Sequence, residues 1–310
     1  MARLKVCSFL PAVTQMMYDM GLQDYLIGVT FECPTIALRE KKPVVRCILE
    51  GKSYSSQQID TFFTESKREG KELYYVDEKL LEEIAPDIIF TQDVCDICQI
   101  DMDCTMAAVA HLPKQPELIS ISPAGLSDVF ENALTIAKAL GAEEKAYQYL
   151  AGLQYRIDAV VDGLREHRDL PKSVALLEWL DPIYNCGHWI PHQIAFAGGV
   201  DMLSHPSGNS IAISWDRIRQ YDPEIMIVAP CGFDTQRTLK EMSHLFTKDG
   251  WTSLKAVKNK RVYIADFELF TQSSAGTLVD GIELLAGLFH PDYLTVPSRL
   301  QTRFQPFFEV

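Results

Sequence analysis

The chain has 310 residues, of which 47% are hydrophobic and 23% are charged, and its formal net charge at pH 7 is -13. This composition is typical of a soluble globular protein long enough for two domains. The acidic balance and the lack of a basic, aromatic-rich stretch argue against a nucleic-acid partner. No apolar run reaches the roughly 18–20 residues that span a bilayer, which predicts a chain that does not cross a membrane.

The N-terminal half alternates short apolar strands with amphipathic helices. Strands are predicted at 5–10, 26–30, 73–76, 88–91 and 118–121, and helices at 14–20, after Ser56, and at 129–140. Between Pro43 and Ser56 no periodicity holds, and the glycine and serines there predict a surface loop. A second long helix over 142–167 would measure about 38 Å at 1.5 Å per residue.

The C-terminal half repeats this alternation. Strands are predicted at 174–179, 225–229 and 261–264, and an amphipathic helix at 277–289. Alternating strands and helices favour mainly parallel sheets. The predicted fold is therefore α/β, with two Rossmann-like lobes at 1–140 and 169–310 and one connecting backbone helix at 141–168.

Two short segments support this division because they repeat one plan. A helix over 77–84 stops at Pro86-Asp87 before a strand, and a helix over 214–221 stops at Pro223-Glu224 before another. Two related lobes normally leave a cleft between them, where ligands bind.

The segment 91–98 ends a predicted strand, and ligands approach such strand ends in open α/β sheets. It places Gln92 and Asp93 at a candidate ligand site. Cys95 and Cys98 have the spacing of a metal-binding or redox pair, with Cys104 nearby. Structural packing is the favoured interpretation, followed by a disulfide and then by a metal site.

Three more loops follow strands of the second half. The loop 179–192 is rich in aromatics and histidines and includes Tyr184, His188 and Trp189, which suits a planar apolar ligand. Alternatively, Trp189 begins a helix and packs inward. The other two loops contain Gly232 with Phe233, and Phe270 with Gln272. No P-loop, GxGxxG, GxSxG or HExxH motif occurs, and no catalytic residue is predicted.

Several segments resemble the cobalamin-binding branch of the helical-backbone (class III) substrate-binding proteins, whose relatives bind iron-siderophores and haem. They run in order along the whole chain: 6–14, 28–33, 91–98, 187–191, 197–200, 230–233, 278–285 and 290–291. The resemblance implies a corrinoid, cobalamin or a related cobamide, held between the lobes with no catalytic cofactor. The residues expected to contact it are Phe31, Glu32, Tyr54, Gln92, Asp93, Tyr184, His188, Trp189, Gly232, Phe233, Phe270 and Gln272.

The resemblance also implies delivery to an ABC importer, with Glu78 and Asp216 as the docking side chains. The alternative for both is a favourable interaction with the dipoles of their helices. His188 is additionally a candidate axial ligand of a central metal, since neutral imidazole binds metals.

Two positions depart from the family pattern. The segment 271–277 replaces a stretch resembling Arg-Pro-Gly-Pro-Arg, and Phe31 replaces a histidine. A haem, an iron chelate or another corrinoid therefore remain alternatives. So do a tetrapyrrole chelatase or reductase, using His188, Glu32 and the Cys95/Cys98 pair, and an intracellular corrinoid chaperone.

The N-terminus passes directly into a strand without the apolar core of a signal peptide. As it reads, the chain is expected in the cytoplasm, and a periplasmic or other extracytoplasmic chain with its leader removed is the alternative. A monomer is expected.

Overall fold

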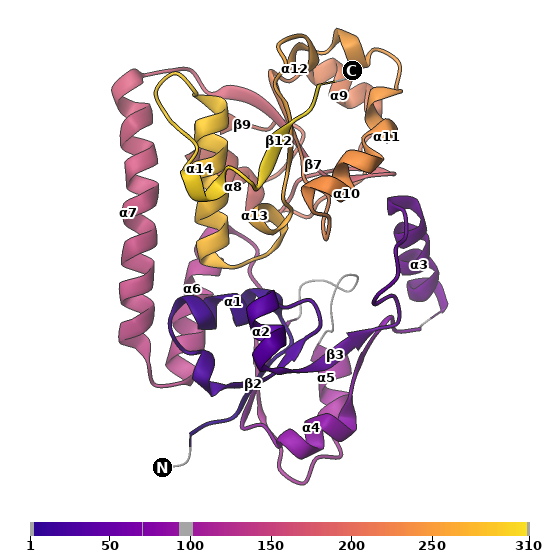
Figure 1. The fold of residues 1–310 in the computed structure, drawn as a ribbon, viewed down its shortest axis with the longest axis vertical. Helices are drawn as coiled ribbons and strands as arrows, with labels where there is room; N and C mark the ends of the chain where they lie inside the picture. The colour runs from indigo at the N-terminus through magenta and orange to yellow at the C-terminus, as the bar shows by residue number, and fades with distance from the viewer. Residues whose placement is uncertain (1–2, 70, 93–101, 309–310) are drawn as a thin grey trace. The chain divides into compact units, whose positions relative to one another are not determined.

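The computed structural model describes residues 3–69, 71–92 and 102–308 (Figure 1). The chain divides into two compact units, each with its own sheet and helices, which confirms the predicted α/β lobes. Unit 1 comprises Met1–Tyr54, Gln58–Pro123 and Ser127–Leu150, and unit 2 comprises Ser55–Gln57, Ala124–Leu126 and Ala151–Val310. The boundary at Leu150 falls inside the long helix α7, Glu143–His167, so the two units share this helix.

Unit 1 is built on a sheet with the strand order β4-β3-β2-β1-β5-β6. Neighbouring strands are parallel except for the antiparallel edge pair β3–β4. The chain moves from β1 to β2 on one side and later adds β5 on the other, which makes β1–β5 the switch point of the sheet. The strands are β1 Val6–Ser8, β2 Leu26–Thr30, β3 Lys42–Cys47, β4 Tyr74–Val76, β5 Ile88–Thr91 and β6 Glu117–Ser120.

Strand β3 corrects the surface loop predicted from Pro43 onward. Val44 and Val45 are both buried, since helices cover this sheet on both faces, and the strand therefore shows no alternation of apolar and polar residues. Pro43 is tolerated as the second residue, close to where a strand begins. The loop prediction holds for the residues that follow β3, up to the first turn of α3.

Helices of unit 1 pack on this sheet around a core that includes Cys7, Phe9 and Ile89. The first helix begins at Pro11, three residues before its predicted start at 14, and the missing N–H of this proline costs nothing there. The helices before α7 are α1 Pro11–Asp19, η1 Gln23–Tyr25, α2 Thr35–Glu40, α3 Ser56–Glu69, α4 Glu78–Ile84, α5 Met102–Val109 and α6 Leu126–Ala139.

Unit 2 is built on a second sheet with the order β12-β11-β10-β7-β8, in which β9 also pairs with β7. The central strands β7, β10 and β11 are parallel, whereas β8 and β12 pair antiparallel at the edges. The sequence did not predict the strands β8, β9 and β12, each of two or three residues. The bounds are β7 Lys172–Leu180, β8 Ile183–Asn185, β9 Gly199–Val200, β10 Ile225–Val228, β11 Val262–Ala265 and β12 Phe304–Pro306.

The core of unit 2 gathers aliphatic side chains of β7, β10 and β11 around Trp251. The apolar helix α14 is almost wholly buried and lies beside the unit 2 part of α7 (Figure 1). Its helices are α8 Ile190–Phe196, α9 Trp215–Tyr221, α10 Thr235–Glu241, α11 Ser243–Phe246, η2 Trp251–Ser253, α12 Lys255–Lys258, α13 Glu268–Thr271, α14 Ala275–Phe289 and η3 Ser298–Leu300.

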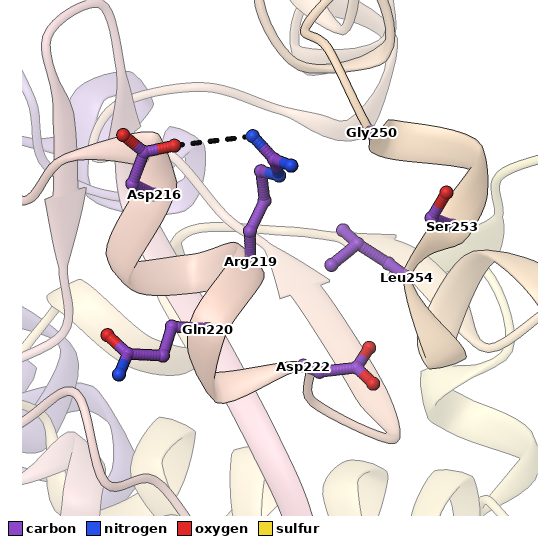
Figure 2. A pocket seen from close by; sticks show the side chains of 7 residues that line it. All are labelled: Asp216, Arg219, Gln220, Asp222, Gly250, Ser253 and Leu254. Carbon is purple, nitrogen blue, oxygen red and sulfur yellow. Dashed lines mark hydrogen bonds and ion pairs between the residues drawn. The ribbon is translucent and has the colours of Figure 1, made fainter.

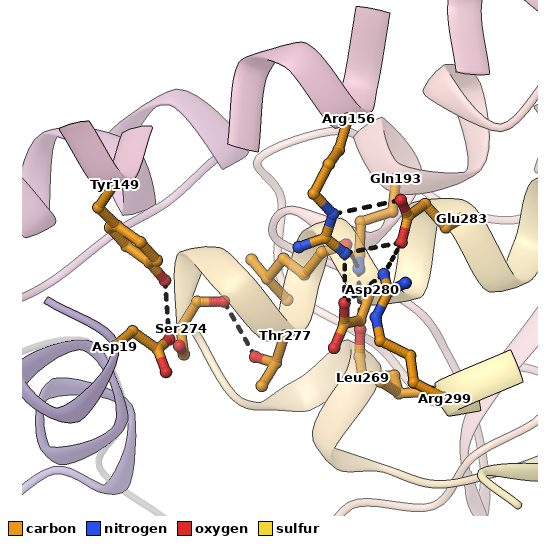
Figure 3. A network of polar contacts seen from close by, with 11 residues as sticks. Asp19, Tyr149, Arg156, Gln193, Leu269, Ser274, Thr277, Asp280, Glu283 and Arg299 are labelled. Atoms are coloured by element: carbon orange, nitrogen blue, oxygen red, sulfur yellow. Dashed lines mark hydrogen bonds and ion pairs between the residues drawn. The ribbon is translucent and has the colours of Figure 1, made fainter. Parts of the chain in front are cut away.

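An ionic network ties α7 to α14 within unit 2 (Figure 3). The Arg156 guanidinium pairs with Asp280 and, at 2.7 Å, with Glu283. Arg299 from η3 pairs with the same two carboxylates. Arg156 thereby holds the middle of α7 to α14.

The two repeated segments form equivalent structures. Asp77 caps α4 by accepting the Leu80 N–H at 3.1 Å, and Ser214 caps α9 by accepting the Arg217 N–H at 3.4 Å. Both helices end in a left-handed residue, Ala85 with φ 46° and Asp222 with φ 48°. None of the described helices is both long and apolar enough to cross a membrane.

Candidate functional site

Most of the predicted ligand residues follow the carboxyl ends of parallel strands in each unit, whereas Tyr54 lies just before α3 and Tyr184 lies on the antiparallel strand β8. In unit 1, Phe31 and Glu32 follow β2, and Gln92 follows β5 at the switch point. In unit 2, the predicted loops follow β7, β10 and β11. Crevices outside such strand ends are the usual binding sites of open α/β sheets.

In unit 1, Tyr74 links the two residues that follow β2. Its hydroxyl donates to the Glu32 carboxylate at 3.2 Å, and its ring centroid lies 6.2 Å from that of Phe31. Tyr74 pairs with Cys47 across β3–β4, so it lies at the carboxyl end of β3 although β4 runs the other way. The sequence did not single out Tyr74, because only the antiparallel pairing places it at this edge.

Helix α3 adds two rings to this edge. Phe63 lies 6.5 Å from Tyr74 between centroids, and its neighbour Phe62 meets Tyr54 edge-on at 4.8 Å. The predicted ligand residues Phe31 and Tyr54 thus belong to a group of five partly buried rings. We call it the aromatic cluster of unit 1: Phe31, Tyr54, Phe62, Phe63 and Tyr74.

Gln92 is 8% exposed, and its amide Nε2 has no hydrogen-bond partner among the residues that the structure describes. A buried amide N–H without an acceptor is unfavourable. The Gln92 amide is therefore well suited to donate a hydrogen bond to an oxygen atom of a ligand or of water. Asp93, Cys95 and Cys98 lie outside the described residues, and their predicted roles stay predictions. Cys104 is described and lies with its Sγ 3.3 Å from a Glu72 carboxylate oxygen.

In unit 2, a carboxylate lies near the end of β7, where Glu178 follows the buried apolar residues 174–177. Glu178 of β7 accepts the Gly187 N–H at 3.2 Å and a hydrogen bond from the Ser210 side chain. Burial raises the pKa of Glu178 to about 7, and both hydrogen bonds oppose that rise. Glu178 was not among the predicted site residues, although a carboxylate inside the predicted buried strand 174–179 is an unusual feature of the sequence.

The turn at Gly187 and His188 is fixed by the segment 207–210. A Cβ on Gly187 would lie 2.3 Å from the Ser210 backbone nitrogen, so only glycine fits. His188 has φ 52°; its N–H donates to Gly208 O at 2.6 Å, and its O accepts the Ser207 N–H at 2.8 Å. The backbone therefore sets the direction of the His188 side chain.

The His188 imidazole is partly buried and makes no hydrogen bond or ion pair with any described residue. Burial lowers the pKa of His188, which favours the neutral ring at physiological pH. Neutral imidazole is the form that binds metal ions. His188 can therefore act as a metal ligand without first losing a protein partner.

Next to this turn, Trp179 lies 5.2 Å from Phe233 between ring centroids. The Arg237 guanidinium lies 3.6 Å from the centroid of the Phe233 ring. Phe233 is 1% exposed, and Trp179 is partly buried with an indole N–H for which no described residue serves as a hydrogen-bond acceptor. At this strand end Trp179 is therefore accessible to a ligand, whereas the predicted ligand residue Phe233 is buried and packs against Trp179.

The predicted ligand residues Trp189 and Phe270 are also buried, which leaves little of either ring accessible to a ligand. The Trp189 indole N–H donates to Phe270 O at 2.6 Å, and the Phe270 side chain is fully buried. Gln193 adds a second tie, since its amide donates to Leu269 O and Leu278 O at 2.8 Å each (Figure 3). Trp189 thus follows the alternative interpretation, in which it packs inward beside the start of α8.

The remaining predicted residues of unit 2 are accessible to different degrees. Tyr184 and Gln272 are partly buried, and Tyr184 pairs with Trp179 across β7–β8. Gly232 is exposed with φ 77°, and no atom lies within 4 Å of where its Cβ would be. Glycine is therefore needed at 232 for the turn rather than for a close approach by another group.

The two predicted docking residues lie in the first turns of α4 and α9. Glu78 is exposed, and the Asp216 side chain is 87% exposed, 3.4 Å from Arg219. Asp216 and Arg219 also help to line a surface pocket of about 490 Å³ (Figure 2), whose lining residues are Asp216, Arg219, Gln220, Asp222, Gly250, Ser253 and Leu254. Because Asp222 precedes β10, this pocket lies toward the opposite edge of the sheet from the strand ends.

A scan of family models matches residues 75–269 to the family described as periplasmic binding protein. Among curated proteins, the chain is 25% identical over 298 residues to an uncharacterized ABC transporter substrate-binding lipoprotein, YvrC, of Bacillus subtilis strain 168. The match covers 93% of this chain and 80% of that protein.

Solved structures with the same fold include two binding proteins. A periplasmic heme binding protein from Pseudomonas aeruginosa has a TM-score of 0.72 at 14% identity, over 99% of both chains. The periplasmic vitamin B12 binding protein BtuF of Vibrio cholerae has a TM-score of 0.65 at 15% identity, over 93% of this chain and 96% of that one. At such identities the likeness concerns the fold alone.

Proposed function

Since this chain belongs to the periplasmic binding protein family, we propose that it binds a corrinoid and delivers it to an ABC-type importer. In this proposal the ligand is cobalamin or a related cobamide, and the strand-end residues described above bind it. The chain is then a carrier and not a tetrapyrrole-acting enzyme, as expected for a family of binding proteins. It acts outside the cytoplasm, in line with the lipoprotein YvrC and with the family description.

One observation carries the choice of a flat metal-containing ligand. The His188 imidazole is held by its backbone and makes no hydrogen bond or ion pair with any described residue, and it lies in the same strand-end turn as Gly187. The partly buried Trp179 lies near the end of β7, the strand that leads toward this turn. Such a pair offers one metal-binding atom and one aromatic surface. The aromatic cluster of unit 1 supplies further apolar surface for a macrocycle.

Haem is the second candidate, because a neutral histidine is equally suited to an iron porphyrin. The departures at Phe31 and at 271–277 weaken the cobalamin assignment in particular. Titrations with hydroxocobalamin, dicyanocobinamide and haemin, followed by absorbance and calorimetry, separate these ligands. Micromolar or tighter binding of a corrinoid supports the first proposal, binding of haemin alone selects the second, and no binding of any of the three overturns both.

The His188→Ala variant tests the role of the imidazole in the same titrations. We expect the absorption bands of the bound metal complex to shift relative to the wild-type complex, since an axial ligand is lost. The His111→Ala variant, at an exposed position between α5 and β6, is the matched control. Identical spectra for wild type and His188→Ala would remove the axial-ligand assignment while leaving the binding function intact.

For docking, we propose Glu78 and Asp216, which occupy equivalent first turns and project charge into solvent. In cells whose growth depends on uptake through this chain, Glu78→Lys and Asp216→Lys should reduce uptake, with the double variant most affected. The purified variants should bind ligand like the wild type. Unchanged uptake in the double variant would assign both carboxylates to their helix dipoles alone.

Cell fractionation distinguishes the importer from an intracellular corrinoid chaperone. A mature chain exposed outside the cytoplasm, accessible to added protease in intact cells, supports delivery to an importer. A chain found in the cytosol alone would contradict it.

A further inference from the structure

Helix α3 lies in the connection between β3 and β4, which is much longer than these two neighbouring strands require. Strands β3 and β4 are antiparallel neighbours, and two to five residues suffice to join such a pair. Here residues 48–73 intervene between Cys47 and Tyr74 and contain the whole of α3. The connection therefore adds a helix at the carboxyl end of β3, the edge at which ligands approach an open α/β sheet.

The apolar side of α3 is not buried in the core of unit 1. Among its residues only Ser56 is buried, whereas α14 of unit 2 buries most of its side chains. Ile59, Phe62 and Phe63 follow the spacing of one helix face, yet all three are only partly buried. A helix that stabilises a fold normally hides such a face, so this one has apolar surface left to cover.

The rings of α3 join those of the sheet edge. Phe63 and Phe31 both lie within 6.5 Å of Tyr74 between centroids, and Phe62 contacts Tyr54 at 4.8 Å. Tyr74 also packs against the core, which fixes the cluster to the sheet. The connection thus extends the aromatic edge of β2 and β3 with rings from a helix.

We propose that α3 is a ligand-binding arm of unit 1, in which Phe62 and Phe63 cover an apolar face of the bound tetrapyrrole. This inference rests on the proposed function and deepens it, because the arm selects for a broad, flat ligand. A small iron chelate offers no face of that size. The arm therefore contributes to affinity for a macrocycle, corrinoid or porphyrin.

The Phe62→Ala/Phe63→Ala double variant tests the arm, with dicyanocobinamide and haemin as probes. Losing two partly buried rings from a contact should raise the dissociation constant about 10-fold or more. The thermal midpoint should change little, since neither ring is in the core. Glu65→Ala on the same helix and Ile36→Ala, at an exposed apolar position of α2, are the controls and should bind like the wild type.

Limited trypsin digestion gives a second readout on the wild-type protein. Cleavage after Lys67 and Arg68, at the end of α3, should slow when the probe is bound. Equal affinity of double variant and wild type, or cleavage at these sites unaffected by bound probe, overturns the arm and leaves the binding function standing. A wild type that binds neither probe nor cobalamin overturns the proposed function itself.

Discussion

Asp87 and Glu224 make the same hydrogen bond in the two units. The Asp87 carboxylate accepts the Lys5 N–H at 2.7 Å, just before β1, and the Glu224 carboxylate accepts the Ser173 N–H at 2.8 Å, near the start of β7. Each acidic residue follows the proline that separates a helix from the neighbouring strand, β5 or β10. The repeated Pro-acid pair therefore joins the start of one central strand to that of the next.

Removing this charge in unit 2 should destabilise the protein at neutral pH. Hydrogen bonds from Ser173 hold the pKa of Glu224 below its ordinary value, so the ionised form stabilises the fold. Glu224→Gln should lower the free energy of unfolding by about 1 kcal/mol at pH 7. Glu166→Gln, at an exposed position of α7, should have no measurable effect.

The sign of the pH dependence follows from the direction of this shift. The Glu224 contribution is complete above its unfolded pKa and disappears as the pH falls through the lower folded value. Urea unfolding of wild type and Glu224→Gln should therefore differ at pH 7 and converge in acid. A constant difference down to pH 3 would contradict the ionic origin of the effect.

Glu178 should give the opposite pH dependence. Because its folded pKa is raised to about 7, the fold binds a proton that the unfolded chain releases near its ordinary value. Its contribution to stability is then largest in acid and falls as the pH rises from the ordinary range of a glutamate to about 7. The Glu178→Gln variant, which retains an acceptor for the Gly187 N–H, should be more stable than wild type at pH 8.

Thermal melts between pH 5 and 8 check this expectation. The midpoint of Glu178→Gln relative to wild type should rise by a few degrees across that range. A difference that does not vary with pH would show that Glu178 is ionised in the folded protein throughout.

Substitution of Gly187 tests how the turn at His188 is held, and substitution of Gly152 on α7 is the comparison. Gly187→Ala places a methyl group against the backbone of 208–210 and should destabilise the protein by about 2 kcal/mol or more. It should also weaken ligand binding, because His188 can no longer keep its position. Gly152→Ala, on α7 with open space around its Cβ position, should instead stabilise by about 0.5–1 kcal/mol.

Chemical denaturation and a ligand titration measure both variants. If Gly187→Ala were as stable as the wild type, the segment 207–210 would have to be free to move away. That result would remove the argument that the backbone fixes His188.

The network on α7 and α14 predicts an asymmetry between two arginines of one helix. Arg156→Ala leaves Asp280 and Glu283 with Arg299 as their cation and should cost about 1–3 kcal/mol. Arg165→Ala removes an exposed pair with Asp162, for which 0–1 kcal/mol is typical. Equal effects on the urea midpoint would show that the network adds nothing beyond a surface pair.

The sequence could predict most strands and the longer helices because their signals are local, whereas it predicted none of the helices α2, α5 and α10 to α13, which have four to eight residues each. Capping residues, Pro-acid stops and runs of apolar side chains place α4, α9, β5 and β10 within a residue of their bounds. The signals fail at β3, where burial on both faces removes the alternation, and at β8, β9 and β12, which are too short for any period to show.

The candidate site was harder to predict because accessibility depends on what packs behind each side chain. Trp189 and Phe270 looked like ligand surfaces in the sequence, yet one indole hydrogen bond ties them together inside unit 2. Tyr74 and Phe63 were not predicted as ligand residues. Tyr74 reaches the strand ends through the antiparallel pairing of β3 and β4, and Phe63 reaches them because it lies on the inserted helix α3.

By itself, the sequence determined the two-lobe α/β plan, its repeated helix–strand joint and the loops that follow the parallel strands. Periodicity and caps act over a few residues, so the order of residues alone encodes them. Only the tertiary structure decided which side chains of those loops remain accessible, and which ring or carboxylate each one meets. Those contacts join residues far apart in the chain, and burial, which sets both accessibility and pKa, exists only once the sheets and helices have packed.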